Sequence, residues 1–301
     1  MDITNTLITQ LLIMALLIAM GFVATKKKWL DLGGTRQLGS ILLNIVTPII
    51  IINSLLKTYN HQEFQSFALI ILVAVAWNVL YILLAKLFFK SDQVIEQASV
   101  VFTNLSFFGI PIVSAVLGKE AVFYLIGPII VYWLFMFTYG EILLTQRKSI
   151  SIKRLFLNPA VIATALGLTI YFSGFQLPSV ILGAMGGIAS LNTPVAMLIM
   201  GCYLAHIDLS YFKLALVWKV CFIRLIVLPL IVILVLVFVP IDFALKYIVL
   251  ICVSSPVGNT VAIFAQQFNL DYRYSAAIIS VSSLLVMLTL PIMSLIGTNL
   301  W

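Results

Sequence analysis

The stretch TNLSFFGIPI, residues 103–112, interrupts an apolar run that is otherwise hydrophobic enough to cross a membrane. Asn104 and Ser106 place polar side chains in this run, and Gly109 and Pro111 are residues that weaken or break a helix. A broken helix frees backbone N–H and C=O groups, each of which costs several kcal/mol when lipid surrounds it. The break is therefore predicted to line a cavity or to be covered by protein.

The composition around this stretch is typical of a membrane protein. Of the 301 residues, 63% are hydrophobic and 9% are charged, whereas about a quarter are charged in an ordinary soluble domain. The net charge of +7 does not indicate nucleic acid as a partner, because the basic residues are scattered over short loops and form no continuous patch. The sequence therefore predicts a polytopic protein whose main surroundings are the lipid bilayer.

Ten runs of mostly apolar residues are long enough to span a bilayer as helices. They cover residues 5–25, 37–56, 64–88, 96–117, 121–144, 156–175, 179–205, 211–239, 243–267 and 273–297. If the N-terminus lies outside, most of the 17 Lys and Arg residues fall in the inner loops. The positive-inside rule then predicts that both termini face the outside of the plasma (inner) membrane.

Similar interruptions recur at matching places in the two halves of the chain. Besides the opening stretch, they are LNIVTPII (43–50) with Thr47 and Pro48, SLNTPVAM (190–197) with Asn192, Thr193 and Pro194, and SSPVGNTVAIF (254–264) with Pro256, Gly258 and Asn259. They fall in the second, fourth, seventh and ninth predicted spans, which we expect to be broken. The alternative is that these are tolerated kinks, because Gly and Pro are common in membrane helices.

The pairing of interruptions predicts an all-α membrane protein built from two repeats of five helices. The first repeat covers residues 1–145, a cytoplasmic linker covers 146–155, and the second repeat covers 156–301. Because five is odd, the repeats cross the bilayer in opposite senses, as in the inverted repeats of secondary transporters.

The two breaks in the fourth and ninth spans point to an anion. We expect the second half of the fourth span to begin near Gly109–Pro111 and that of the ninth near Asn259, both close to the bilayer midplane. A helix N-terminus carries roughly half a positive charge. Two such ends, together with the amides of Asn104 and Asn259, would suit a carboxylate.

Two charged residues inside the spans leave alternatives open. Arg224 lies deep in the eighth span, where it would either balance the charge of an anionic substrate or cap carbonyls freed by a broken helix. Glu141, near the inner end of the fifth span, would either carry a proton or pair with Arg147 or Lys148.

Four motifs in order along the chain resemble the auxin efflux carrier (PIN-like) family, in its short bacterial form. They are NLSFFGIPI (104–112), LNTPVAMLIMGCYLA (191–205), RLIVLPLI (224–231) and SSPVGNTVAIFAQQFNLD (254–271), the last followed by a serine-rich helix ending LTLPIMSL. They are similar to that family's fourth, seventh, eighth and ninth helices. The similarity extends along the whole chain, but only TQRKSISIKR (145–154) stands where the long plant members have a large cytoplasmic loop.

The resemblance implies an architecture like that of sodium/bile-acid symporters and Na+/H+ antiporters. Helices 1, 2, 6 and 7 would form a scaffold, often a contact between the two copies of a homodimer. Helices 3–5 and 8–10 would form a moving transport domain, with helices 4 and 9 crossing at their breaks. By resemblance, Asn104, Gly109 and Pro111 would line one side of the crossover, and Pro256, Gly258 and Asn259 the other. Family members export auxin or carry small organic acids.

These observations together predict a secondary transporter of a small organic anion, auxin-like or a mono- or dicarboxylate, that works by alternating access. The predicted substrate-binding residues are Thr47, Pro48, Asn104, Ser106, Gly109, Pro111, Asn192, Thr193, Pro194, Arg224, Pro256, Gly258 and Asn259. An uncoupled anion channel or facilitator of the same fold is the alternative. A membrane enzyme or receptor is disfavoured, since the sequence contains no catalytic motif. We predict no metal or cofactor; whether H+, Na+ or neither is coupled to transport stays open.

Overall fold

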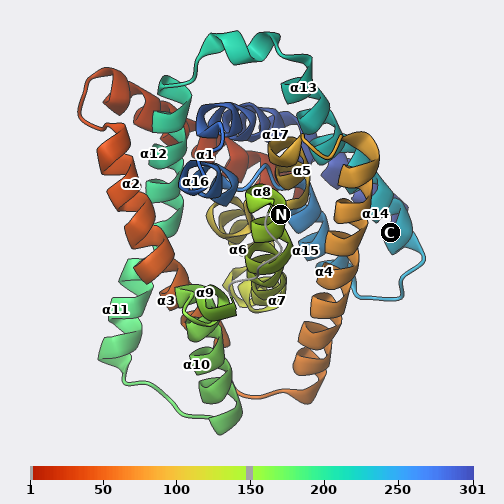
Figure 1. The fold of residues 1–301 in the computed structure, drawn as a ribbon. Coiled ribbons are helices and arrows are strands. Elements are labelled where there is room, and N and C mark those ends of the chain that lie inside the picture. The colour runs from red at the N-terminus through yellow and green to blue at the C-terminus, as the bar shows by residue number, and fades with distance from the viewer. Residues whose placement is uncertain (1–2, 147–151) are drawn as a thin grey trace.

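The computed structural model describes residues 3–146 and 152–301, which are helical apart from short connections (Figure 1). The helices of the first half are α1 (Ile3–Lys26), α2 (Leu32–Ile41), η1 (Leu42–Val46), α3 (Thr47–Leu55), α4 (His61–Phe88), α5 (Val94–Val101), η2 (Leu105–Gly109), α6 (Ile110–Val116), η3 (Lys119–Ala121), α7 (Val122–Phe135), η4 (Met136–Gly140) and α8 (Glu141–Thr145). Those of the second half are α9 (Ile152–Phe156), α10 (Pro159–Ser173), α11 (Ser179–Ala189), α12 (Asn192–Ala205), η5 (Leu209–Lys213), α13 (Ala215–Phe222), η6 (Ile223–Val227), α14 (Leu228–Val237), α15 (Phe243–Ser254), α16 (Asn259–Gln267) and α17 (Tyr272–Leu300).

Among the described residues, seven helical segments are long and apolar enough to cross a membrane. They are Ile3–Lys26, Leu32–Leu55, His61–Phe88, Lys119–Thr145, Ser179–Ala205, Ala215–Val237 and Tyr272–Leu300. Three shorter apolar helices, Leu105–Val116, Pro159–Ser173 and Phe243–Ser254, correspond to the remaining predicted runs. The chain is thus a helical multi-pass membrane protein.

The prediction of a broken second span is wrong. The backbone stays helical from α2 through η1 into α3, and Pro48 lies in the first turn of α3. The segment η1 is a π-helical turn, which shifts the hydrogen-bonding register by one residue. Such a shift accommodates the missing N–H of a proline without an unwound gap.

The seventh span changes direction, but at a different residue from the proline. Ser190 and Leu191 form a turn between α11 and α12. Pro194 follows inside the first turn of α12, where a backbone N–H has no intrahelical partner in any case. The interruption in this span is therefore a kink of two residues, and both helices remain part of one candidate span.

Helices α1 and α12 cross at very close range, on the same side of the molecule as α2 (Figure 1). The crossing depends on two glycines: a Cβ at Gly21 would collide with the backbone of Leu198, and one at Gly201 with the backbone of Ile18. Around this pair, α2 packs on α12, and α3 packs on both α10 and α11.

The other helices contact one another, and α6 and α17 also pack on α1. Helix α4 contacts α5 and α7, while α17 packs against α13, α14, α15 and α16. At the two predicted crossing breaks, Phe102 and Thr103 in the fourth span and Ser255 and Val257 in the ninth span are all buried. The segments that contain the two predicted crossing breaks are therefore enclosed by protein.

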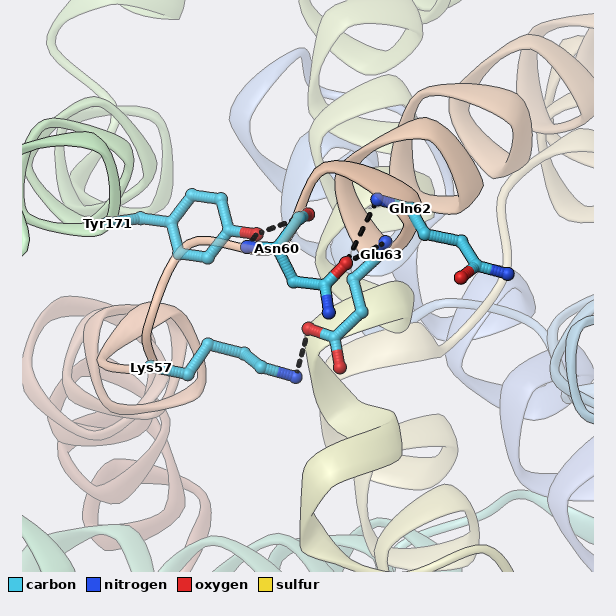
Figure 2. Close-up of polar contacts among 5 residues, drawn as sticks. All are labelled: Lys57, Asn60, Gln62, Glu63 and Tyr171. Atoms are coloured by element: carbon cyan, nitrogen blue, oxygen red, sulfur yellow. Dashed lines mark hydrogen bonds and ion pairs between the residues drawn. The ribbon is translucent and has the colours of Figure 1, made fainter.

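The loop from α3 to α4 is tied to α10, a helix from the other half of the chain (Figure 2). Asn60 caps α4, since its side-chain oxygen accepts from the backbone N–H groups of Gln62 and Glu63. The buried phenol of Tyr171 bonds both the N–H and the carbonyl of Asn60, at 3.2 and 3.3 Å. Lys57 and Glu63 form an ion pair across the loop. These bonds fix the start of α4 against α10.

Candidate functional site

The interrupted fourth and ninth spans meet at a single antiparallel β-bridge between Thr103 and Val257. The backbone N–H of Asn104 donates to the carbonyl of Pro256, and that of Gly258 donates to the carbonyl of Phe102, each at 2.9 Å. Two extended segments, 102–104 and 255–258, thus supply each other with the partners that a continuous helix would have provided. Satisfying these groups is what allows non-helical backbone inside a membrane protein.

The second half of the fourth span begins earlier than predicted. It starts at Leu105, with Asn104 as N-cap accepting from the N–H of Phe107 at 3.3 Å, and not near Gly109–Pro111. Asparagine is among the strongest N-cap residues, whereas Pro111 fits the first turn of a helix and leaves it intact. Gly109 ends the π-helical turn η2, so both residues lie inside the half-helix.

The second half of the ninth span begins where it was predicted to begin. Helix α16 starts at Asn259, with Gly258 as its N-cap. Its break is further supported from neighbouring helices. Arg224 donates to the carbonyl of Ser255 at 3.0 Å, and the hydroxyl of Ser282 on α17 accepts from the N–H of Val257 at 3.2 Å. Of the two interpretations of Arg224, the cap on a freed carbonyl is the one that this geometry supports.

A small cleft opens beside the bridge, and its closed part, about 20 Å3, has room for about one water molecule. Leu43, Thr103, Asn104, Leu105, Ser106, Phe107, Tyr132, Trp133, Gly258, Asn259, Thr260 and Ile263 line it. Of the predicted site residues, the cleft brings together Asn104, Ser106, Gly258 and Asn259.

Three polar atoms on the cleft wall have no hydrogen-bond partner in the described part of the chain. They are Nδ2 of Asn104 and both Nδ2 and Oδ1 of Asn259. These side chains are 5% and 6% exposed, so bulk water does not satisfy them freely. A buried amide without a partner costs about 1–3 kcal/mol, and a polar ligand in the cleft would recover that energy.

Asn192 reaches the crossover from α12. Its Nδ2 donates to the carbonyl of Ser106 at 3.1 Å, while its Oδ1 has no partner among the described residues. The hydroxyl of Thr47 is likewise buried without a partner there. Neither residue lines the cleft, and the same holds for Pro48, Gly109, Pro111, Thr193, Pro194, Arg224 and Pro256.

Sequence reasoning missed several residues of the cleft, chiefly Tyr132 and Thr260. The hydroxyls of these two residues share a hydrogen bond between α7 and α16. Gly258 lies beneath them, where an added Cβ would come within 2.9 Å of the Thr103 carbonyl oxygen and 3.1 Å of the Tyr132 hydroxyl. Nothing in the spacing of Tyr132 along the chain marks it, whereas Thr260 directly follows Asn259.

Glu141 is buried and pairs with Arg154 of α9 at 3.0 Å. The predicted partners Arg147 and Lys148, with half of the predicted linker, lie outside the described residues. The ion pair joins α8, which continues the fifth span, to the start of the second half of the chain.

Comparison with known proteins identifies the family. A family model described as "Membrane transport protein" matches the chain twice, over residues 6–153 and 143–294. No curated protein matches the chain. The two matches cover nearly the whole sequence and fall one on each half, as expected for a repeated domain. The chain therefore belongs to the membrane transport protein family, which includes the auxin efflux carriers that its motifs resemble.

Proposed function

We propose that this transporter is a secondary carrier that moves a small organic anion across the plasma membrane by alternating access. The proposal rests on the unpartnered amides of Asn104 and Asn259 on the wall of the crossover cleft. Each stands at the start of a half-helix, where backbone N–H groups and the helix dipole favour negative charge. A carboxylate placed between them would accept hydrogen bonds from both amides.

The lining of the cleft favours one class of anion. Its remaining walls are largely apolar or aromatic, with Phe107, Tyr132 and Trp133 the largest side chains, and none of the described lining residues is charged. A second carboxylate would be buried against apolar groups without a counter-charge, at high cost. The substrate is therefore a monocarboxylate with an apolar or aromatic body, rather than a dicarboxylate.

The closest helix packing favours a division into a fixed scaffold and a moving transport domain. We propose ten spans in two inverted repeats, with a scaffold of α1, α2–α3, α10 and α11–α12, and a transport domain of the remaining spans. The close contacts of α1 with α12 and of α3 with α10 fall inside the proposed scaffold. Thr47, Pro48, Asn192, Thr193 and Pro194 would form the scaffold side of the substrate path. The scaffold would also carry the contact surface of a homodimer.

Uptake into proteoliposomes tests the proposal. Indole-3-acetate, benzoate, malonate and malate are offered in radiolabelled form, with and without an imposed Na+ or pH gradient. We expect saturable uptake of the two aromatic monocarboxylates and at least tenfold slower uptake of the two dicarboxylates. Uptake that does not saturate, with single-channel currents, would instead identify an anion channel. A protein that moves none of the four anions would contradict the proposal.

Asn259→Ala is the sharpest variant, because neither polar atom of its amide bonds to the described protein, so its removal breaks no internal hydrogen bond. We expect it to lower uptake at least tenfold while the protein remains folded. Asn104→Ala should do the same, with an added loss of stability from the missing N-cap. Asn299→Ala removes an exposed amide at the end of α17 and serves as the matched control with normal uptake. If both cleft variants take up substrate at the wild-type rate, the substrate-binding site does not lie at the crossover.

A further inference from the structure

Arg224 is the largest fully buried side chain in the described protein, with 0% exposure. It lies in the π-helical turn η6 of the eighth span. An arginine at such depth is costly and normally has an acidic partner or faces a watery cavity. In the described residues its guanidinium has no carboxylate within ion-pair distance, since the two ion pairs there are Lys57–Glu63 and Arg154–Glu141.

The contacts of the guanidinium account for only part of its hydrogen-bonding capacity. Nη2 donates to the carbonyl of Ser255, and the group lies over the ring of Tyr81 at 5.1 Å, a favourable cation–π arrangement. Nε and Nη1 have no partner among the described residues. The positive charge is therefore held in place by neutral groups and is not neutralised by them.

The charge stands directly behind the crossover. Ser255 precedes Pro256, whose carbonyl receives the N–H of Asn104, and Gly258 on the cleft wall follows two residues later. Arg224 does not line the cleft itself, which holds no charged side chain in the described chain. A fixed charge in a low-dielectric interior acts over a longer range than in water, so it influences the cleft without direct contact.

We propose that Arg224 is a positioning residue with two separable effects. Through Ser255 it holds the ninth-span break in its extended form, and through its unneutralised charge it gives the cleft its preference for anions. It does so without touching the substrate. The second effect rests on the proposed function; the first does not.

Three substitutions separate the effects. Arg224→Lys keeps the charge and a donor, Arg224→Gln keeps a donor but removes the charge, and Arg224→Met removes both. Lys219→Gln is the matched control: it removes a cation from the same span, where Lys219 caps the carbonyl of Phe88. For indole-3-acetate uptake, we expect KM to rise at least tenfold in the Gln and Met variants. It should stay within threefold of wild type in Arg224→Lys and in the control.

A neutral competitor distinguishes charge from general damage. Indole-3-acetamide has the same body without the negative charge, so its inhibition constant should change less than threefold in Arg224→Lys, Arg224→Gln and Lys219→Gln, which leave a donor at position 224. A wild-type KM in Arg224→Gln would overturn the charge effect. In the same Gln variant, an equal loss of affinity for carboxylate and carboxamide would do so too, because it would point to a distorted cleft.

The structural effect is measured without any substrate, by hydrogen exchange at the backbone amides of Asn104 and Gly258. We expect exchange at least tenfold faster in Arg224→Met than in wild type, with Lys219→Gln unchanged. Unchanged exchange in Arg224→Met would overturn this part. If wild-type protein transports none of the four anions, the proposed function and the charge effect fail together, while amide exchange still decides whether Arg224 holds the break.

Discussion

The backbone N–H of Asn104 donates to the carbonyl oxygen of Pro256 at 2.9 Å, and so joins two helices that belong to opposite halves of the chain. The reciprocal bond from Gly258 to Phe102 closes a two-residue bridge. Each interrupted helix leaves backbone groups that would be costly in lipid, and each supplies the partner that the other needs. The two breaks therefore stabilise each other. A substitution in one of the two extended segments should weaken the backbone hydrogen bonds of both.

Gly258→Ala should separate the two segments. The new Cβ would lie 2.9 Å from the carbonyl oxygen of Thr103, a backbone atom that cannot move away without loosening the bridge. We expect a loss of about 1–3 kcal/mol in stability, as for other overpacked positions. Thermal unfolding in detergent measures it. Gly39→Ala, where nothing lies within 4 Å, is the control and should be neutral or slightly stabilising. Equal melting temperatures for the two variants would contradict the bridge geometry.

Tyr132→Phe should destabilise the crossover by leaving the Thr260 hydroxyl buried without a partner. The expected cost is about 1–3 kcal/mol. Thr260→Val should cost a similar amount, whereas the double variant should cost clearly less than the sum, because no hydroxyl is then left unpaired. A double-mutant cycle of unfolding free energies checks this prediction. Strict additivity would mean that the two hydroxyls do not interact.

Arg154→Ala should destabilise the junction between the two halves, because it leaves the Glu141 carboxylate buried without its cation. Since the Arg154 side chain is 45% exposed, water screens the pair, and we expect about 1–3 kcal/mol rather than the full cost of a buried pair. Adding Glu141→Gln should recover much of the loss. If the double variant is as unstable as Arg154→Ala alone, the carboxylate is not the group left unsatisfied.

Tyr171→Phe should loosen the loop between α3 and α4 (Figure 2). It removes the hydroxyl that bonds the backbone of Asn60 on both sides, at a cost of about 0.5–1.5 kcal/mol. Faster hydrogen exchange at the Asn60 amide would report the change locally. Tyr59→Phe, which removes an exposed hydroxyl bonded to His61, is the control and should leave that amide protected. If the Asn60 amide is equally protected in wild type, Tyr171→Phe and Tyr59→Phe, the Tyr171 hydroxyl does not stabilise this loop.

Much of the fold could be predicted from sequence because its signals are local. Runs of apolar residues mark the membrane segments, and each of the ten predicted runs contains an apolar helix in the described chain. The start of α16 at Asn259 was likewise predictable, since a break at Pro256 and Gly258 leaves few other starting points. Asn104 and Asn259 could be named as candidate site residues because polar side chains are rare in such runs.

The sequence by itself determined that this is a helical multi-pass membrane protein, because its composition is strongly apolar. The positions of its polar and helix-breaking residues also determined that the helices are interrupted near Asn104 and near Pro256. Only the tertiary structure decided that the fourth-span half-helix starts at Leu105, that Arg224 serves the carbonyl of Ser255, and that Tyr132 meets Thr260. The physical reason is that a freed backbone group takes whichever partner packing brings within hydrogen-bond distance. That partner comes from a segment far away in the chain, so no local pattern specifies it.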